Sequence, residues 1–263
     1  MEKILVQIYE VQEPREAGPL IELGVDHIGG VILFREEWKQ PLLRESIELI
    51  NHSPSKSTLI PLLTETDEIL RALEYYRPGL VHFCDDIPLQ DHDGIEKSCE
   101  RMDRLHERVR REFPDVSIIR SVPVPEADLP DAQTAERAVL RVASLLVDTC
   151  DFFMTDTRLG WTAGASSGQQ PVEGFVGITG KICHWGIASA LCRRVRIPVI
   201  LAGGISPDNV REAVRTVRPA GVDSCTLTNM TDYNGRPIRF RKDPARVRSL
   251  LDEVRLLETA SDD

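Results

Sequence analysis

Short runs of β-branched and other apolar residues recur along the chain, and segments of helical period separate them. The runs are apolar over their whole length, which is typical of strands buried on both faces of a parallel sheet. This alternation predicts an α/β fold made of repeated βα units. The predicted strands are Ile4–Ile8, His27–Leu33, Leu59–Thr64, Leu80–Cys84, Ser117–Val122, Phe152–Thr155, Val199–Ala202 and Val222–Cys225.

The segments between the runs carry an apolar stripe on one helical face, clearest over residues 95–113, 210–217 and 247–254. Helix starts are marked by Ser206-Pro207-Asp208 and Asp243-Pro244, which supply a capping side chain and a first-turn proline. A length of 263 residues suits one complete (β/α)8 TIM barrel, and 41% hydrophobic residues are enough to fill its core. We therefore expect a single domain over residues 1–263. A doubly wound open sheet would show the same periodicity.

Charge and cysteine usage narrow the class of protein. The formal net charge is −10, and no Lys/Arg stripe of the kind that binds a phosphate backbone is present, so we expect no nucleic-acid partner. No apolar run reaches the roughly 20 residues of a membrane span, and no signal-peptide pattern opens the chain. The expectation is a cytoplasmic protein without membrane contact. Six cysteines lack CxxC spacing and are expected to be reduced thiols.

Two adjacent glycines, Gly203 and Gly204, follow the seventh predicted strand and precede a helix start. Glycine lets backbone N–H groups approach a phosphate without an obstructing Cβ, and a helix N-terminus adds a favourable dipole. TIM barrels often bind phosphate after strands seven and eight. Gly203 and Gly204 are therefore candidate phosphate ligands, although the pair would also make a tight βα turn.

The stretch Leu201–Val210, the stretch Val217–Asp223 and the later Lys242-Asp243-Pro244 together resemble the C-terminal quarter of the phosphoribosylanthranilate isomerase family, in the same order. The resemblance implies a TIM barrel and an Amadori-type aldose-to-ketose isomerisation of a phosphorylated sugar amine, in tryptophan biosynthesis. It implies a small phosphorylated substrate and no cofactor. Cys225-Thr226-Leu227 stands where the family has S-S-G, so Thr226 is a further phosphate candidate through its hydroxyl.

The resemblance continues upstream. Phe153–Thr157 is similar to the family's L-L-L-D-T, and Asp156 then matches its general acid. Partial desolvation at a strand end would raise the pKa of that carboxyl toward neutrality. Gly180 and Lys181 match the family's G-G-T-G-K and are candidate substrate ligands. The long loop over residues 158–178 is expected to act as a lid.

Other positions depart from the family pattern. Tyr9 stands where the family has its catalytic cysteine, and a phenol with a pKa near 10 is a poor base at neutral pH. The adjacent Glu10 is an alternative base if the backbone shifts by one position. His82 and Cys84 replace a Gln and a His, and strand alternation places them on the same side. Cys84 is our preferred replacement base, since a neighbour such as His82 would help to generate its thiolate. Arg35, after the second strand, is a candidate ligand for a substrate anion.

Three functions remain open at this stage. The first is the family isomerisation, with Asp156 as acid and Cys84 as base. The second is a related sugar-phosphate enzyme with different, metal-assisted chemistry, because His82, Cys84, Asp85, Asp156 and His184 carry potential ligand atoms. Packing in the barrel interior is the simpler interpretation of His82 and Cys84, and no metal is expected. The third is a non-catalytic binding homologue. Either a monomer or a homodimer is compatible with the helix faces.

Overall fold

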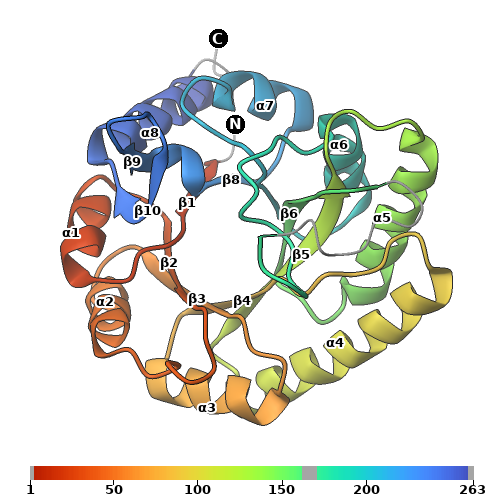
Figure 1. Cartoon of the computed structure of the whole chain (residues 1–263), viewed down its shortest axis with the longest axis horizontal. Helices are drawn as coiled ribbons and strands as arrows, with labels where there is room; N and C mark the ends of the chain where they lie inside the picture. Colours follow the sequence, from red (N-terminus) through yellow and green to blue (C-terminus); the bar gives the residue numbers. More distant parts are fainter. Residues whose placement is uncertain (1–2, 162–170, 260–263) are drawn as a thin grey trace.

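The computed structural model describes residues 3–161 and 171–259 and shows a closed barrel of parallel strands surrounded by helices (Figure 1). The barrel strands are β1 (Leu5–Ile8), β2 (His27–Ile32), β3 (Lys56–Pro61), β4 (Leu80–Phe83), β5 (Ser117–Pro125), β6 (Phe152–Arg158), β7 (Val199–Leu201) and β8 (Gly221–Ser224). The helices are α1 (Pro14–Glu22), α2 (Pro41–Asn51), α3 (Thr66–Tyr76), α4 (His92–Glu112), α5 (Ala132–Leu146), α6 (Trp185–Arg194), α7 (Val210–Val217) and α8 (Pro244–Thr259). β1 pairs with β8, which confirms the barrel and excludes the open sheet.

Five strands lie within one residue of their predicted bounds at each end, and three differ by three residues. β3 begins at Lys56 and ends at Pro61, three residues earlier than predicted at each end, because the apolar Leu62 and Leu63 are buried beyond the ladder. β5 and β6 run on to Pro125 and Arg158, three residues past their predicted ends, and stay paired over this extension. The extension places Asp156 inside β6.

Two apolar clusters make up the core. The larger lies between the strands and the surrounding helices. The smaller fills the barrel interior and includes Tyr9, Val31, Ile60, Met154 and Ile200. Because side chains alternate along each strand, one residue packs on the helices while the next enters the barrel. The interior therefore collects side chains from neighbouring strands in one place.

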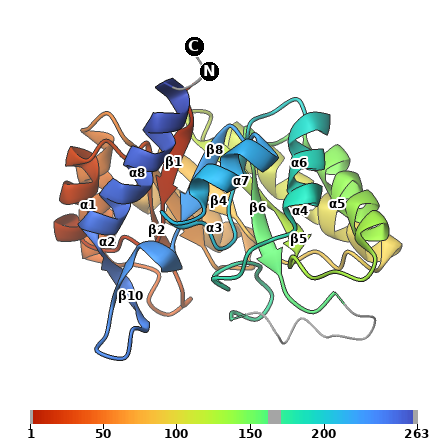
Figure 2. The same ribbon diagram turned by 90° about the horizontal axis from the view of Figure 1, so that it is seen from above.

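The chain has an additional hairpin after β8. A short 3-10 turn, η2 (Thr226–Thr228), leads into β9 (Asn229–Thr231) and β10 (Pro237–Lys242), which pair antiparallel. The buried Lys242 donates from Nζ to the carbonyl of Cys225 at 2.9 Å and to Oδ1 of Asn229 at 2.5 Å. The hairpin projects from the same face as the loop between β6 and α6, opposite the chain termini (Figure 2).

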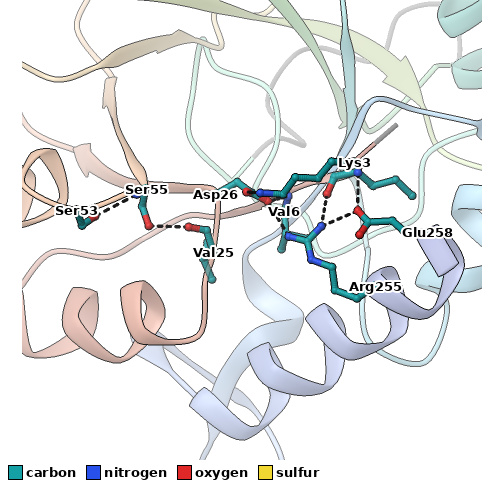
Figure 3. A network of polar contacts seen from close by, with 9 residues as sticks. Lys3, Val6, Val25, Asp26, Ser53, Ser55, Arg255 and Glu258 are labelled. Atoms are coloured by element: carbon teal, nitrogen blue, oxygen red, sulfur yellow. Dashed lines mark hydrogen bonds and ion pairs between the residues drawn. The ribbon is translucent and has the colours of Figure 1, made fainter. Parts of the chain in front are cut away.

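The opposite, N-terminal face is closed by a polar network around Asp26 (Figure 3). The Asp26 carboxylate accepts from the backbone N–H of Val6 at 2.9 Å and from Nη2 of Arg255 at 3.0 Å, and it also contacts Lys3. Arg255 donates to Glu258 at 2.7 Å, and Glu258 accepts the N–H of Ile4 at 2.7 Å. The network connects α8, the last helix, to the first strand, and so joins the beginning and the end of the chain on one face of the barrel. No helix in the described ranges is long and apolar enough to cross a membrane.

Candidate active site

Two adjoining pockets open at the C-terminal ends of the strands, where catalytic groups of this fold belong. The first is lined by backbone-rich turns after β6, β7 and β8. Its lining residues are Asp156, Thr157, Gly177, Ile178, Thr179, Gly180, Ala202, Gly203, Gly204, Ile205, Asp223, Cys225, Thr226 and Leu227. We refer to it as the glycine-lined pocket.

The glycines of this pocket occupy positions that a side chain could not take. Gly203 has φ +94°, and a Cβ there would lie 2.3 Å from Oγ1 of Thr157. Gly204 has φ +66°, and its Cβ would lie 2.8 Å from the backbone nitrogen of Ile182. Gly180 lies beside Thr226, since its Cβ would be 3.7 Å from the Thr226 methyl group. The predicted phosphate candidates Gly180, Gly203, Gly204 and Thr226 thus line one pocket, with exposed backbone suited to an anion.

The second pocket lies over the barrel interior and is mainly apolar, and we refer to it as the apolar pocket. Its lining residues are Tyr9, Glu10, Val31, Ile60, Leu62, His82, Cys84, Met154, Asp156, Val176, Gly177, Ile178, Asp223 and Cys225. Aliphatic side chains from β2, β3 and β6 make its walls, which suits a flat apolar group.

The two pockets share a short boundary. Asp156, Gly177, Ile178, Asp223 and Cys225 line both of them. Asp156 comes from β6 and Asp223 from β8, so two carboxyl groups stand where the pockets meet. A ligand with an anionic end and an apolar end would place its central atoms beside these carboxyls.

Asp156 is buried, with 8% of its surface exposed. Burial is the main cause that raises the pKa of its carboxyl; the Ser121 hydrogen bond lowers it and the nearby Asp223 carboxylate raises it, and the net pKa is about 8. A Cβ at Gly177 would lie 2.6 Å from Oδ1 of Asp156, so the loop after β6 packs directly over the carboxyl. This environment makes Asp156 a proton donor near neutral pH.

Asp223, in β8, lines both pockets as Asp156 does, and it is also buried. Burial raises the pKa of its carboxyl, a hydrogen bond from Gln7 and the charge of Lys242 partly offset this rise, and the net pKa is about 7. Nε2 of Gln7 donates to Oδ1 of Asp223 at 3.2 Å, and Oε1 of Gln7 lies 3.2 Å from Nδ1 of His27. Two buried carboxyls with pKa values of about 7 and about 8 are suited to act as base and acid of one reaction.

The predicted replacement base, Cys84, lies in the apolar pocket but in unfavourable surroundings. Burial raises the pKa of its thiol well above the usual value, and the Asp156 and Asp85 carboxylates raise it further. Tyr9 is buried as well. Burial raises the pKa of its phenol well above the usual value, and the Asp223 and Asp156 carboxylates raise it further. Neither group is set up to take a proton at neutral pH.

Glu10 follows the end of β1 in a left-handed conformation with φ +63°. This turn brings the side chain of Glu10, as well as that of Tyr9, to the apolar pocket. The Glu10 carboxylate forms an ion pair with Arg239 of β10. The hairpin therefore places a guanidinium directly behind one wall of the apolar pocket.

Two of the other predicted ligands, Lys181 and Arg35, lie outside these two pockets. Lys181 is exposed and lines neither of them, although its carbonyl accepts from Oγ1 of Thr157 at 2.7 Å. Arg35 pairs with Glu68 and lines a separate surface depression with Trp38. His82 is buried in the apolar pocket.

The predicted lid is described only in part, since residues 162–170 lie outside the described residues. Its C-terminal part contacts the loop after β4. The N–H of Val176 donates to the carbonyl of Cys84 at 2.8 Å, and that of Asp86 to Gly174 at 2.9 Å. Arg158 and Asp86 add an ion pair at 3.0 Å. These contacts hold residues 174–176 over the apolar pocket. Within the described ranges, no group of three or more His, Cys, Asp or Glu side chains is arranged to hold a metal ion.

Several residues of the mouth had no role in the sequence-based prediction. Asp223 stands inside a stretch that resembles the family. However, the rise of its pKa to about 7 depends mainly on burial, which no sequence motif encodes. Ser121 and Arg239 lie in segments without any motif. The position of Asp223 near the C-terminal end of a predicted barrel strand was the sequence signal that could have identified it.

Comparison with known proteins agrees with this geometry. A family model described as N-(5'-phosphoribosyl)anthranilate (PRA) isomerase matches residues 105–226. An N-(5'-phosphoribosyl)anthranilate isomerase of Methanosarcina acetivorans is 25% identical over 256 residues, covering 96% of this chain and 94% of the relative.

Solved structures give the same result for the fold. The N-(5'-phosphoribosyl)anthranilate isomerase of Pyrococcus furiosus superposes with a TM-score of 0.66 at 19% identity, covering 96% of this chain and 99% of that one. A phosphoribosyl anthranilate isomerase in complex with reduced 1-(o-carboxyphenylamino)-1-deoxyribulose 5-phosphate superposes with a TM-score of 0.62 at 18% identity, covering 96% and 98%. The chain is thus similar to N-(5'-phosphoribosyl)anthranilate isomerases over nearly its whole length, and the family model covers a little under half of it.

Proposed function

We propose that this protein isomerises N-(5'-phosphoribosyl)anthranilate to 1-(o-carboxyphenylamino)-1-deoxyribulose 5-phosphate, a step of tryptophan biosynthesis. The observation that carries the proposal is the pair of buried carboxyls at the boundary between a glycine-lined pocket and an apolar pocket. The substrate has a phosphate at one end and an aromatic ring at the other, with the reacting sugar carbons between them.

Substrate binding follows from the two pockets. The phosphate occupies the turn made by Gly203 and Gly204, with Gly180 and Thr226 on the facing wall. The aromatic ring lies among the aliphatic side chains of the apolar pocket. Arg239 is assigned to the carboxylate on that ring, because its guanidinium is already held beside the pocket by Glu10.

The chemistry divides between the two carboxyls. Protonated Asp156 gives its proton to the ring oxygen as the nitrogen lone pair opens the furanose, which leaves a protonated Schiff base at C1. Ionised Asp223 removes the proton from C2, and the C–H electrons move toward the imine to give an enolamine. Loss of the C2 hydroxyl proton and protonation at C1 complete the ketose. Asp223 takes the role predicted for Cys84, because its pKa lies near 7 while that of the buried thiol is raised.

A direct assay tests this function. Purified protein is mixed with N-(5'-phosphoribosyl)anthranilate, and the fall in substrate fluorescence is followed for the wild type, Asp156→Asn and Cys84→Ser. Turnover by the wild type, loss in Asp156→Asn and near-normal turnover in Cys84→Ser support the proposal. If the wild type converts no substrate, the proposed function is wrong. If a folded Cys84→Ser protein is inactive, the Cys84 thiol and not Asp223 is the base.

A further inference from the structure

The glycine-lined pocket has no positive charge of its own. Among the described residues that line it, none is Lys or Arg, whereas Asp156 and Asp223 are acidic. Lys181 is exposed and lines neither pocket. A phosphate monoester is close to a dianion at neutral pH. Because two carboxyls also lie close by, a cation near the pocket is needed to balance the charge of a bound phosphate.

One buried lysine lies on the other side of the pocket wall. Lys242 of β10 is 3% exposed, and its Nζ donates to the carbonyl of Cys225 at 2.9 Å and to Oδ1 of Asn229 at 2.5 Å. Cys225 itself lines the glycine-lined pocket, but Lys242 does not. A single residue of the chain therefore separates the ammonium group from the pocket.

The Lys242 ammonium group is not neutralised by a carboxylate. Both of its hydrogen-bond acceptors are neutral. The carboxylate of Glu10 is paired with Arg239, and that of Glu16 with Arg241. Within residues 3–161 and 171–259, no acidic side chain forms an ion pair with Nζ of Lys242. Buried charges are normally paired because an unpaired one is costly, so this surplus positive charge indicates an anionic ligand nearby.

The bond from Lys242 also orients the turn after β8. In a trans peptide the N–H points opposite to the C=O, so a donor that holds the Cys225 carbonyl turns the N–H of Thr226 to the other side. Thr226 lines the glycine-lined pocket. The carbonyl of Leu227 is held in a similar way by Nε of Arg246 in α8, at 2.8 Å. Because linked hydrogen bonds polarise one another, an ammonium group on the carbonyl also strengthens the N–H as a donor to an anion.

Resting on the proposed isomerisation, we propose that Lys242 is a positioning residue for the substrate phosphate. Its ammonium group fixes the peptide between Cys225 and Thr226 and supplies, from behind that peptide, the positive charge that the pocket lacks. The ammonium group does not touch the phosphate. The phosphate in turn brings the negative charge that the buried ammonium group lacks in the free protein, so a phosphorylated substrate is favoured over an unphosphorylated one.

The same charge acts on the proposed base and so provides a second measurement. Burial raises the pKa of Asp223, while the hydrogen bond from Gln7 and the charge of Lys242 lower it. Loss of the ammonium group should therefore raise this pKa. If Lys242 were only a structural contact, its loss would admit water, reduce the burial of Asp223 and lower the pKa instead. The titratable or charged groups that face Asp223 are Tyr9 and Glu10 after β1, Asp156 in β6, Cys225 after β8 and Lys242 in β10.

Binding of inorganic phosphate to the substrate-free protein tests the inference without reference to turnover. Titration calorimetry near neutral pH compares the wild type with Lys242→Met, Lys242→Gln and Arg241→Met. Both Lys242 variants should bind phosphate about tenfold more weakly, because each lacks the ammonium charge. Arg241→Met is the matched control, since it removes a 47% exposed arginine from the same strand, and it should bind phosphate as the wild type does. If Lys242→Met does not fold, Lys242→Gln, which keeps a donor for the Cys225 carbonyl, gives the same comparison.

Steady-state kinetics supply the second arm. Lys242→Met should raise KM about tenfold with a smaller change in kcat, and the rising limb of its kcat profile should move to higher pH. Unchanged phosphate affinity in a folded Lys242 variant overturns the inference, as does a rising limb that moves to lower pH. A wild type that binds no phosphate overturns the anion site and the inference together. If phosphate binds in a Lys242-dependent way but no substrate is converted, the isomerase proposal fails and the role of Lys242 in phosphate binding stands.

Discussion

At the level of single residues, the site depends on two carboxyls with different surroundings. Asp156 lies under the loop after β6 with a pKa of about 8, while Asp223 is held by Gln7 with a pKa of about 7. Each is buried, and each carries one part of the proposed proton transfer. Their separate substitution should therefore have distinct consequences.

Asp156→Asn should lower kcat by about 10²- to 10⁴-fold with little change in KM, because an amide cannot protonate the ring oxygen. The same variant should be more stable than the wild type at pH 9, by on the order of 2 kcal/mol. The folded-state pKa of Asp156 is raised from the usual 3.8 to about 8, so this carboxyl lowers wild-type stability as pH rises from the unfolded to the folded pKa, and the loss is complete above it. Steady-state kinetics and urea unfolding at pH 5 and pH 9 check both effects. A variant less stable at pH 9 contradicts the burial of this charge.

The pH dependence of kcat should be bell-shaped with a narrow maximum between about 7 and 8. Asp223 must be ionised, so activity rises as pH increases through about 7. Asp156 must be protonated, so activity falls as pH increases through about 8. The two apparent pKa values belong to the interacting pair. In Asp223→Asn the rising limb should disappear together with most of the activity, and an unaltered rising limb would assign the base elsewhere.

The proposed acid and phosphate turn follow from the sequence alone, whereas the proposed base, Asp223, follows only from the structure. Asp156, Gly203 and Gly204 stand in stretches that match the family pattern, and their roles follow from local backbone position. The raised pKa of the Cys84 thiol and the neutral-range pKa of Asp223 come from burial among side chains of several strands. Spacing along one strand contains no information on that environment.

At the level of elements, the β9–β10 hairpin is the part of the mouth that the sequence prediction did not include. It carries Arg239, which pairs with Glu10, and Arg241, which lies 3.5 Å from Glu16 on α1. The two arginines have similar exposure, 40% and 47%, but only Arg239 pairs with a residue that lines the apolar pocket. They therefore form a matched pair for mutagenesis.

Arg239→Gln should raise KM about tenfold or more with a smaller effect on kcat, because the ring carboxylate loses its charged partner. Arg241→Gln should leave both constants close to those of the wild type. The comparison is made by steady-state kinetics on N-(5'-phosphoribosyl)anthranilate. If the two variants had the same KM, Arg239 would have no specific role in binding the substrate.

The elements themselves were largely predictable, and the differences have physical reasons. Apolar runs identify strands, yet a run cannot show where the ladder stops, so β3 was placed three residues late and β5 and β6 were ended too early. Leu62 and Leu63 are apolar because they are buried beyond β3. The prolines in the extension of β5, such as Pro123, argued against a strand by propensity, but pairing with β6 overrides it.

At the level of the whole molecule, function and stability lie at opposite ends of the barrel. The mouth holds buried carboxyls that cost stability when ionised, whereas the N-terminal face holds Asp26 in hydrogen bonds. Burial alone would raise the Asp26 pKa, but hydrogen bonds from Lys3, Val6 and Arg255 lower it overall. Its contribution is present above the unfolded pKa and is lost as pH falls through the lower folded value.

Asp26→Asn should lower the free energy of unfolding by about 1–3 kcal/mol at pH 7, because the partners of a part-buried carboxylate lose a charged acceptor. Activity of the folded variant should be unchanged, since Asp26 lies at the far end of the barrel. Asp148→Asn is the control, because Asp148 is 77% exposed in its ion pair with Arg196 and should contribute little. Urea unfolding monitored by circular dichroism measures both, and equal stabilities would contradict the role of the network.

The most direct test of the account as a whole is identification of the product by proton NMR. N-(5'-phosphoribosyl)anthranilate is incubated with the wild type in D₂O, with Asp156→Asn and buffer alone in parallel. The account predicts that the anomeric signal is replaced by the C1 signal of 1-(o-carboxyphenylamino)-1-deoxyribulose 5-phosphate, with deuterium incorporated at C1, in the wild-type sample alone. Disappearance of substrate only by hydrolysis to anthranilate and ribose 5-phosphate, at the rate seen in buffer, would contradict it.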